Sequence, residues 1–316
     1  MRIVVTGSAG RLGRVLVPRL LASGLADEVT GIDRAPAAYA DTRYRHHRLD
    51  VRDPRSAALL EGADALAHLA FVLMGGGLGR RRHDREVVRG INVEGSCRVF
   101  EAAARAGVRQ LVFVSSAAVY GAWPDNPPRL TETAPLRAMP GFAYAEDKIA
   151  VERWLDDFSS AHPDLTVTRL RPHAIVGAQA HPLLNLVLKQ PLYPAARPVP
   201  LTQCIWEQDV ARAMILALRQ RTPGIFNLAA DPPMSLRDML GLVRRWRLPV
   251  TPSLLAATHR LAWRLTPAAG EPGWVQGLRH PLVLDTRQAQ RTLRFTPLLD
   301  VAECVRRAAR GWPDDA

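Results

Sequence analysis

Tyr144 and Lys148 are the residues of this sequence whose types and spacing most directly suggest chemistry. They stand four residues apart in "YAEDK", so a helix places both on one face. A phenol is a poor base at neutral pH, and a nearby ammonium group lowers its pKa by stabilising the phenolate. Of the 42 Lys and Arg residues, only Lys148 and Lys189 are lysines. A compact ammonium where the chain otherwise uses arginine indicates an acid/base pair; the alternative is a stacked Tyr beside a solvated Lys on a helix surface.

A pair of hydroxyl groups stands at the end of an apolar run. Ser115 and Ser116 close "QLVFVSS" (110–116), a segment that predicts a buried strand. Open parallel sheets bind their ligands beyond the carboxyl ends of the strands, so a hydroxyl there is placed to hydrogen-bond a substrate oxygen. The competing interpretation is a serine that satisfies backbone groups in a turn.

A glycine-rich loop opens the chain. Gly7, Gly10 and Gly13 in "VVTGSAGRLG" follow an apolar run and precede a helical pattern. Glycines at such a junction permit a tight turn and close approach to a pyrophosphate, while the helix N-terminus supplies free N–H groups and a positive dipole. The loop therefore predicts a dinucleotide site, with a plain glycine-rich turn as the alternative.

Acidic residues at the ends of the next two strands refine this prediction. Asp33 lies 20 residues after Gly13, where a carboxylate accepts hydrogen bonds from ribose hydroxyls and repels a 2′-phosphate. NAD is therefore the expected cofactor and NADP the less favoured one. Arg34 works against this preference if it accommodates the phosphate, but not if it stacks on the adenine. Asp50 and Val51 end the third strand, near where adenine would lie, although Asp50 also suits a helix cap.

The elements that must position these residues alternate between strands and helices. This alternation predicts an α/β fold, a Rossmann-type, doubly wound parallel sheet with helices on both faces. The expected strands cover residues 2–7, 28–34, 44–50, 65–71, 110–116 and 166–172, and the expected helices cover 11–24, 54–61, 84–106 and 143–160. We divide the chain into an NAD-binding domain at 1–175 and a smaller, mostly helical substrate-binding portion at 176–316, with 224–230 returning to the sheet.

Composition narrows the class of protein. The chain is 47% hydrophobic and 23% charged, as globular proteins are, and no run approaches the roughly 20 apolar residues of a membrane span, so no membrane partner is expected. "MRIVVTG" enters a strand pattern without a signal peptide, and three scattered cysteines without metal-ligand spacing suit a reducing cytoplasm without a metal site. The net charge of +12 is interpreted as scattered arginine rather than a nucleic-acid surface, because "GRRRHDR" (79–85) lacks aromatics.

Together these motifs resemble those of the extended short-chain dehydrogenase/reductases, often called the NAD-dependent epimerase/dehydratase family. The shared pieces, in the family's order, are "TGSAGRLG", Asp33, "LDVRD", "HLA" (68–70), "INVEGS" (91–96), "VSSAAVYG", "YAEDK", "LRPHAIVG" (170–177) and "FNLAA". The resemblance implies that Tyr144 is the acid/base and Lys148 its partner on the nicotinamide ribose. It implies that Ser116 holds the substrate oxygen.

The resemblance also implies the surroundings of this set. Asn92 is expected to support it, and the backbone around Pro172 and His173 to lie beside the nicotinamide. The helices at about 84–106 and 143–160 are expected to pair with their symmetry mates in a homodimer. The implied cofactor-binding residues are Gly7, Ala9, Gly10, Arg11, Leu12, Gly13, Asp33, Arg34, Asp50, Val51, Leu69, Ala70, Asn92, Tyr144, Lys148, Pro172 and His173.

Departures from the family pattern bear on the reaction. Ala117 and Ala118 stand where nucleotide-sugar dehydratases carry an Asp-Glu pair, so elimination lacks its acid and base. Thr202 stands where nucleotide-sugar epimerases carry an arginine that grips the pyrophosphate, and Arg279 matches a second phosphate-binding arginine only loosely. The segment "FVLMGGGLG" (71–79) is either a lid over an apolar substrate or a flexible loop.

Three functions are therefore weighed. The preferred one is an NAD-dependent epimerase or oxidoreductase that transfers a hydride at a secondary alcohol or ketone carbon of a small molecule, with a nucleotide sugar as the candidate substrate. The second is an NAD- or NADP-dependent ketoreductase or alcohol dehydrogenase acting on a less charged, apolar substrate. The third, a non-catalytic NAD(P) sensor, is disfavoured because a sensor needs no activated phenol.

Overall fold

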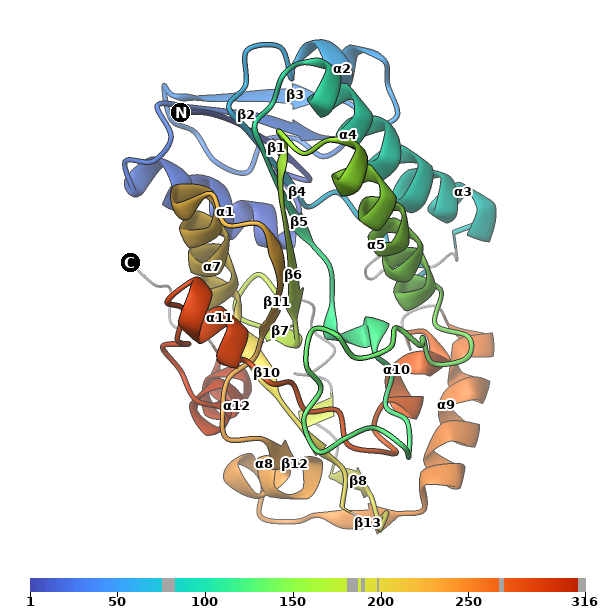
Figure 1. The fold of residues 1–316 in the computed structure, drawn as a ribbon. Coiled ribbons are helices and arrows are strands. Elements are labelled where there is room, and N and C mark those ends of the chain that lie inside the picture. The colour runs from blue at the N-terminus through green and yellow to red at the C-terminus, as the bar shows by residue number, and fades with distance from the viewer. Residues whose placement is uncertain (76–82, 181–186, 189–190, 198, 267–269, 312–316) are drawn as a thin grey trace.

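A seven-stranded parallel sheet forms the centre of the molecule (Figure 1). The computed structural model describes residues 1–75, 83–180, 187–188, 191–197, 199–266 and 270–311. The strand order is β11-β6-β5-β4-β1-β2-β3, with every neighbouring pair parallel. The predicted Rossmann-type fold is therefore confirmed.

The strands of this sheet are short and mostly buried. The sheet strands are β1 (Arg2–Thr6), β2 (Glu28–Asp33), β3 (Tyr44–Arg48), β4 (Ala65–His68), β5 (Gln110–Val114), β6 (Thr166–Pro172) and β11 (Gly224–Leu228). Six of them end one to three residues before the predicted ends, at residues 6, 33, 48, 68, 114 and 228. This leaves Gly7, Leu69, Ala70, Ser115 and Ser116 just beyond the strands. The residues expected to act on ligands thus lie in loops at the carboxyl edge.

Helices cover both faces of the sheet because the strands are apolar on both sides. The helices of the sheet region are α1 (Arg11–Ala22), α2 (Arg55–Ala58), α3 (Arg85–Arg89), the π-turn η1 (Gly90–Glu94), α4 (Gly95–Arg105), the 3-10 turn η2 (Ala117–Val119), α5 (Ala143–Ala161), α7 (Glu207–Gln220) and α11 (Arg287–Thr292). One core cluster joins the sheet to α1 and α7, and another joins it to α4 and α5. The core is therefore split into two layers by the sheet.

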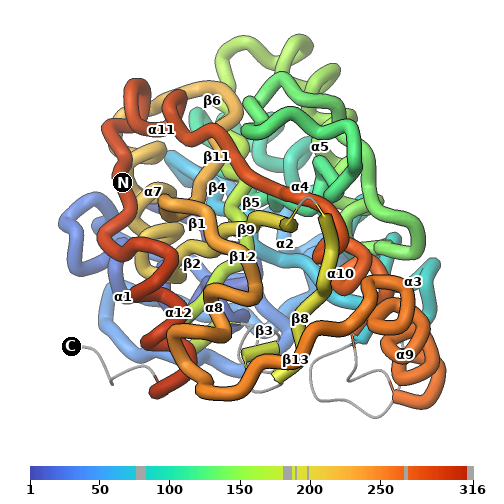
Figure 2. The backbone as a smooth tube through the Cα atoms, turned by 90° about the horizontal axis from the view of Figure 1, so that it is seen from below, coloured from blue at the N-terminus to red at the C-terminus, as the bar shows by residue number. Residues whose placement is uncertain are grey.

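The remaining elements gather beyond the carboxyl edge of the sheet (Figures 1 and 2). They are β7 (Ala174–Val176), β8 (Leu192–Pro194), β9 (Leu201–Thr202), β10 (Cys204–Trp206), β12 (Met234–Ser235), α8 (Leu236–Val243), β13 (Leu248–Val250), α9 (Pro252–Leu265), α10 (Pro272–Gln276) and α12 (Val301–Arg310). The strands pair as β7 with β10, β9 with β12 and β8 with β13. The C-terminal half also contributes β11 to the main sheet, and its helices α7 and α11 pack against that sheet. The two halves of the chain therefore share one sheet.

Two segments singled out in the sequence, the predicted lid and the arginine-rich run, lie only partly within the described residues. In the segments 71–79 and 79–85, residues 76–82 lie outside the described part, so the lid and the arginine-rich run stay predictions. Across the described residues, no helix is both long and apolar enough to cross a membrane. The same residues contain no group of three or more His, Cys, Asp or Glu side chains placed to hold a metal ion.

Candidate active site

The glycine loop turns sharply between β1 and α1. Gly7 has a φ of +71°, and its N–H donates to the carbonyl oxygen of Ile32 at 2.8 Å. A Cβ on Gly7 would lie 2.7 Å from the backbone of Leu69 and Ala70, and a Cβ on Gly13 would collide with the carbonyl oxygen of Gly7. The close approach of these backbones therefore requires glycine at both positions.

Helix α1 offers an open N-terminus to an anion. Its first residue is Arg11; the preceding Gly10 provides no side-chain cap, and its first turn holds no acidic residue. Both features suit the pyrophosphate of a dinucleotide, which binds to free N–H groups at a helix start. Arg11 also donates to the carbonyl oxygen of Ala180 at 3.0 Å, while Leu12 packs against the core and Ala9 is buried.

Asp33 ends β2 and lies beside the glycine loop. Its Oδ2 accepts the N–H of Ala9 at 3.0 Å and its Oδ1 accepts the N–H of Ala35 at 2.9 Å. Each carboxylate oxygen has a further lone pair for a ribose hydroxyl. These residues fit NAD, because the carboxylate faces the loop that would hold the pyrophosphate.

The neighbouring charges pair with one another. Arg34 is exposed and lies 3.9 Å from a carboxylate oxygen of Asp50, whose other oxygen accepts from Arg52 at 2.9 Å. The hydrogen bond from Arg52 holds the pKa of Asp50 below its ordinary value. Asp50 does not cap α2, because Pro54 occupies the N-cap position. Val51 is buried in the core rather than turned to the loop.

Tyr144 stands in the first turn of α5 within a group of aromatic rings. Its ring centroid lies 5.5 Å from that of Phe71, 5.7 Å from Phe142 and 6.3 Å from Trp274, with the Trp274 ring stacked on it. Burial raises the pKa of Tyr144 to about 12, and the nearby Ser116 side chain acts on it in the opposite direction. The predicted Ser-Tyr pair is therefore brought together.

Lys148 lies beneath Tyr144 in a pocket of rings. It is 4% exposed, and its Nζ donates to the carbonyl oxygen of Val114 at 2.6 Å. The same Nζ lies 3.6 Å from the Phe71 ring centroid and 5.8 Å from that of Tyr144. Burial lowers the pKa of Lys148 to about 7, against the opposing effect of nearby carboxylates. The lysine is thus an interior group, and the surface alternative is wrong.

The expected lowering of the Tyr144 pKa is not what this structure shows. Desolvation is the larger effect at both members of the pair, so the pKa of Tyr144 rises while that of Lys148 falls. Both shifts favour the uncharged forms, as burial does. In this structure Tyr144 is a phenol that holds its proton at neutral pH.

Asn92 supports the site from the π-turn. It is fully buried; its side-chain oxygen accepts the N–H of Val72 at 2.8 Å, and its Nδ2 donates to the Val72 carbonyl oxygen at 2.9 Å. Nδ2 also donates to Asp147 at 3.0 Å, and Asp147 accepts two hydrogen bonds from Arg85. Asn92 therefore joins the segment after β4 to the helix that carries Tyr144 and Lys148.

A buried polar network lies behind the hydroxyl pair. Ser115 donates to Glu152 at 2.5 Å, and Glu152 pairs with the guanidinium of Arg171. Arg171, which is 2% exposed, also donates to Tyr120 at 2.7 Å, and Tyr120 donates to Asn227 at 2.8 Å. This network joins the segments "VYG", "LRP" and "FNL" of this chain, and it assigns Ser115 to structure rather than to a ligand.

Glu271 and Trp274 complete the site and were missed by the sequence analysis. Glu271 is 4% exposed; its Oε1 accepts the N–H of Ala143 at 2.8 Å, which caps α5 from a residue 128 positions away. Oε2 is buried without a hydrogen-bond partner among the described residues. Burial raises the pKa of Glu271 to about 7. Only the run "EPGW" hinted at a local helix start; nothing in it indicated contact with Tyr144.

Pro172 and His173 lie at the end of β6, beside the carboxyl edge. The His173 Nε2 lies 3.1 Å from the carbonyl oxygen of Leu282 and 3.5 Å from the Thr202 hydroxyl. Burial lowers the pKa of His173 to about 4, so the ring is neutral and positions the loop.

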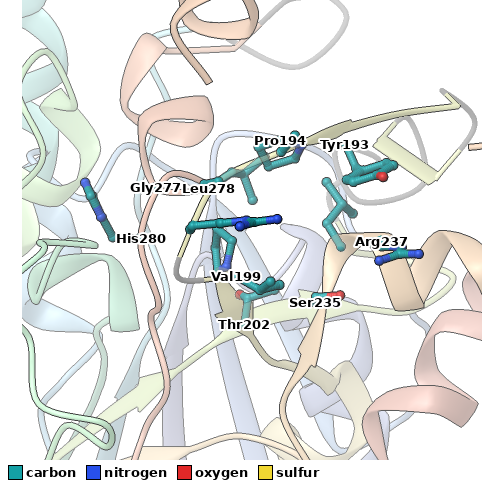
Figure 3. A pocket seen from close by; sticks show the side chains of 14 residues that line it. Tyr193, Pro194, Val199, Thr202, Ser235, Arg237, Gly277, Leu278 and His280 are labelled. Carbon is teal, nitrogen blue, oxygen red and sulfur yellow. The ribbon is translucent and has the colours of Figure 1, made fainter. Parts of the chain in front are cut away.

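A cavity of about 260 Å³ is lined by residues of the C-terminal portion of the chain (Figure 3). Its lining joins β8 and the following loop to α8 and to the residues after α10. The lining residues are Tyr193, Pro194, Ala195, Ala196, Arg197, Val199, Pro200, Thr202, Ser235, Leu236, Arg237, Gly277, Leu278 and His280. Thr202 and its neighbour His173 link the cavity to the carboxyl edge, and α10 links it to Tyr144 through Trp274. Arg279 is exposed and does not line the cavity.

Residues 3–229 match the model of the NAD dependent epimerase/dehydratase family, and the chain belongs to this family. It is therefore an NAD-dependent enzyme of the extended short-chain dehydrogenase/reductase type, as its motifs predicted. An uncharacterised protein of Mycobacterium tuberculosis is 28% identical over 78% of this chain and 67% of its own length. UDP-glucose 4-epimerases of Mycolicibacterium smegmatis and Yersinia enterocolitica are 31% and 34% identical, each over 58% of this chain and over 58% and 56% of their lengths.

Solved structures resemble the whole chain in fold. MoeE5, solved with UDP-glucuronic acid and NAD, has a TM-score of 0.73 at 24% identity and covers 97% of both chains. A UDP-glucose-4-epimerase of Stenotrophomonas maltophila, solved with NAD and a formylated UDP-arabinopyranose, has a TM-score of 0.74 at 24% identity and covers 98% of this chain and 97% of that one. The fold therefore extends through the C-terminal portion.

Proposed function

We propose that this enzyme transfers a hydride at a secondary alcohol or ketone carbon of a nucleotide sugar, as an epimerase does. The observation that carries the proposal is the meeting of Ser116, Tyr144 and Lys148 at the carboxyl edge of the sheet, next to a glycine loop shaped for NAD. The relatives named as UDP-glucose 4-epimerases support the same reaction class.

Each residue of the set has a role that its surroundings favour. Tyr144 exchanges a proton with the substrate oxygen, and Ser116 hydrogen-bonds the same oxygen and the phenol. Lys148 places its Nζ beneath the phenol, where it is a donor for ribose hydroxyls. Bound NAD supplies the hydride acceptor. Gly7, Asp33 and the start of α1 hold its pyrophosphate and ribose.

The cavity is the proposed place of the substrate's anionic part. Arg197, Arg237 and His280 line it, so it offers cationic and hydrogen-bonding groups to a diphosphate. In this proposal these side chains bind the pyrophosphate, which is the role of the epimerase arginine whose position is occupied by Thr202 in this chain. Trp274 of α10 stacks on Tyr144, and Gly277, just after α10, lines the cavity, so we propose that one extended substrate spans the two places.

A reductase acting on an apolar substrate is the second candidate. The rings of Phe71, Phe142 and Trp274 around Tyr144 favour it, because they surround the reacting position with apolar surface. This candidate leaves the arginines of the cavity without a role.

Kinetics on the substrate pair UDP-glucose and UDP-galactose separate the two candidates. We expect interconversion that Tyr144→Phe abolishes, and an Arg237→Gln variant whose KM rises about tenfold while its NAD affinity is unchanged. Arg153→Gln, at an exposed site on α5, is the matched control. Reduction of apolar ketones with no turnover of any nucleotide sugar would establish the second candidate instead.

Cofactor choice is tested at Asp33. Asp33→Asn keeps one carbonyl oxygen for the Ala9 N–H but loses the charge and an acceptor, so NAD affinity falls by about 1–3 kcal/mol. Calorimetric titration with NAD and NADP measures both affinities. Tighter binding of NADP than NAD by the wild-type protein would show that Arg34 determines the preference.

A further inference from the structure

Helix α9 turns a row of leucines toward solvent. Leu254, Leu261 and Leu265 are 56%, 57% and 77% exposed, and their spacing of seven and four residues places them on one side of the helix. Ala256, on the other side, is the one buried residue of this helix. If α9 packed its leucine row into the core, these leucines would be buried and the opposite side of the helix would be exposed.

Further exposed apolar side chains precede α9 in the chain. Trp246 is 76% exposed and Leu248 is 54% exposed, and β13 pairs with β8, where Leu192 is 37% exposed. Of the ten large hydrophobic side chains exposed among the described residues, six belong to this region. Figures 1 and 2 place β8, β13 and α9 together, at the end of the molecule away from β3.

The charge of this region has one sign. Residues 239–270 contain no Asp or Glu, and their charged side chains are Arg244, Arg245, Arg247, Arg260 and Arg264. The helical spacing puts Arg264 and Arg260 along one edge of the leucine row. Both of these arginines are exposed. Exposed leucines and a tryptophan flanked only by arginine are the composition of helices that lie in the surface of an anionic membrane.

We propose that the surface formed by Trp246, Leu248, Leu254, Leu261 and Leu265, with its flanking arginines, binds the headgroup region of anionic lipid bilayers. The leucines enter the boundary of the acyl chains, the arginines contact lipid phosphates and the tryptophan lies at the interface. A second copy of the chain fits less well. Its arginines would face these arginines, with no acidic residue within residues 239–270 of either copy.

This proposal differs from the expectation that no membrane partner exists. That expectation rested on the lack of an apolar run long enough to cross a bilayer. A helix that lies in the plane of the surface needs only one apolar side and no such run. The absence of a spanning helix among the described residues is therefore compatible with this surface.

Vesicle flotation of the full chain tests the proposal. We expect binding to vesicles of phosphatidylcholine with one third phosphatidylglycerol, weak binding to pure phosphatidylcholine, and release by high salt. The double variants Leu261→Ser/Leu265→Ser and Arg260→Gln/Arg264→Gln should each bind on the order of tenfold more weakly. Leu298→Ser and Arg153→Gln, at exposed sites on other elements, are the controls and should bind like the wild type.

Three results would overturn it. The first is failure to bind the anionic vesicles, with circular dichroism that shows a folded protein. The second is equal binding by wild type and both double variants. The third is a doubled mass in solution that returns to that of one chain in Leu261→Ser/Leu265→Ser, which would identify a second copy as the occupant. All four variants change exposed side chains, so folding is expected to be retained.

Discussion

At the scale of single residues, the site is governed by burial. Lys148 and Glu271 both lie within the protein near Tyr144, and both have pKa values moved to about 7 by desolvation. Carboxyl and ammonium groups that titrate near neutral pH are typical of active sites. The chemistry of Tyr144 is therefore set as much by the residues that exclude water from it as by its charged partner.

Lys148→Arg should not be a conservative change. The Lys148 ammonium fits between the Phe71 and Phe113 rings and the Val114 carbonyl oxygen, with 4% of the residue exposed. A guanidinium is wider, so we expect a loss of about 1–3 kcal/mol in unfolding free energy. Turnover should fall tenfold or more. Urea denaturation and the rate of hydride transfer measure the two effects.

Two comparisons complete that prediction. Tyr144→Phe should lose at least as much turnover as Lys148→Arg, and the double variant should be little worse than Tyr144→Phe, because the residues act as a unit. Arg153→Lys on the same helix is the matched control. Wild-type turnover in Lys148→Arg would mean that the lysine at this position is an accident of composition.

Glu271 should make stability depend on pH. Its pKa is raised from 4.5 to about 7, so the folded protein holds this proton more tightly than the unfolded chain. The stabilisation is complete below about pH 4.5 and is lost as the pH rises through about 7; it amounts to at most about 3 kcal/mol. Glu271→Gln should remove this dependence. Unfolding free energies of both proteins at pH 5 and pH 8 test the prediction, with Glu101→Gln as an exposed control. Parallel pH profiles for wild type and Glu271→Gln would contradict it.

At the scale of elements, sequence patterns located the sheet well and the C-terminal contacts poorly. Strands such as "RIVVT" and "QLVFV" are apolar throughout because both faces are covered, and that signal is local. Glu271 and Ala143 are joined by a hydrogen bond although they lie 128 positions apart in the sequence. The spacing of apolar residues within a segment does not predict such a long-range contact. The cavity was missed for the same reason, since its lining comes from β8, α8 and the segment after α10.

The exposed side of α9 was missed for a different reason. Apolar residues occur on both sides of this helix, so a hydrophobic pattern does not tell which side packs inward. Ser115 illustrates the same limit at one position. The sequence placed both serines at the carboxyl edge, but only the structure separates Ser115, which donates to Glu152, from Ser116, which lies close enough to Tyr144 to affect its pKa.

The π-turn before α4 should depend on Asn92. Asn92→Ala leaves the N–H and carbonyl of Val72 without partners, and each such loss costs about 1–3 kcal/mol. We expect lower stability and faster hydrogen exchange at the Val72 amide. Cys97→Ala, on the neighbouring α4, is the control. Unchanged exchange at Val72 in Asn92→Ala would show that the π-turn holds this segment without the side chain.

At the scale of the whole molecule, the homodimer stays a prediction. It places α3, α4 and α5 against their symmetry mates, which puts the interface on the face of the sheet opposite α1 and α7. Light scattering at micromolar concentration should give a mass near twice 34.8 kDa. Ala150→Arg, at a partly exposed site on α5, should halve that mass, whereas Leu254→Ser on α9 should leave it unchanged. A wild-type mass of 34.8 kDa would show a monomer and would contradict the predicted homodimer.

The position of β11 has a consequence for how the chain is made. Of the seven strands in the central sheet, β11 is the last to be synthesised, and it occupies the edge of the sheet beside β6, while α7 from the same stretch covers the core next to α1. A nascent chain that has emerged only as far as residue 175 exposes the unpaired backbone of β6 and the apolar side of the sheet. Such edges recruit other strands. Residue 228 must therefore leave the ribosome before β6 can be paired along its whole length, and a fragment cut at residue 175 should accumulate in inclusion bodies.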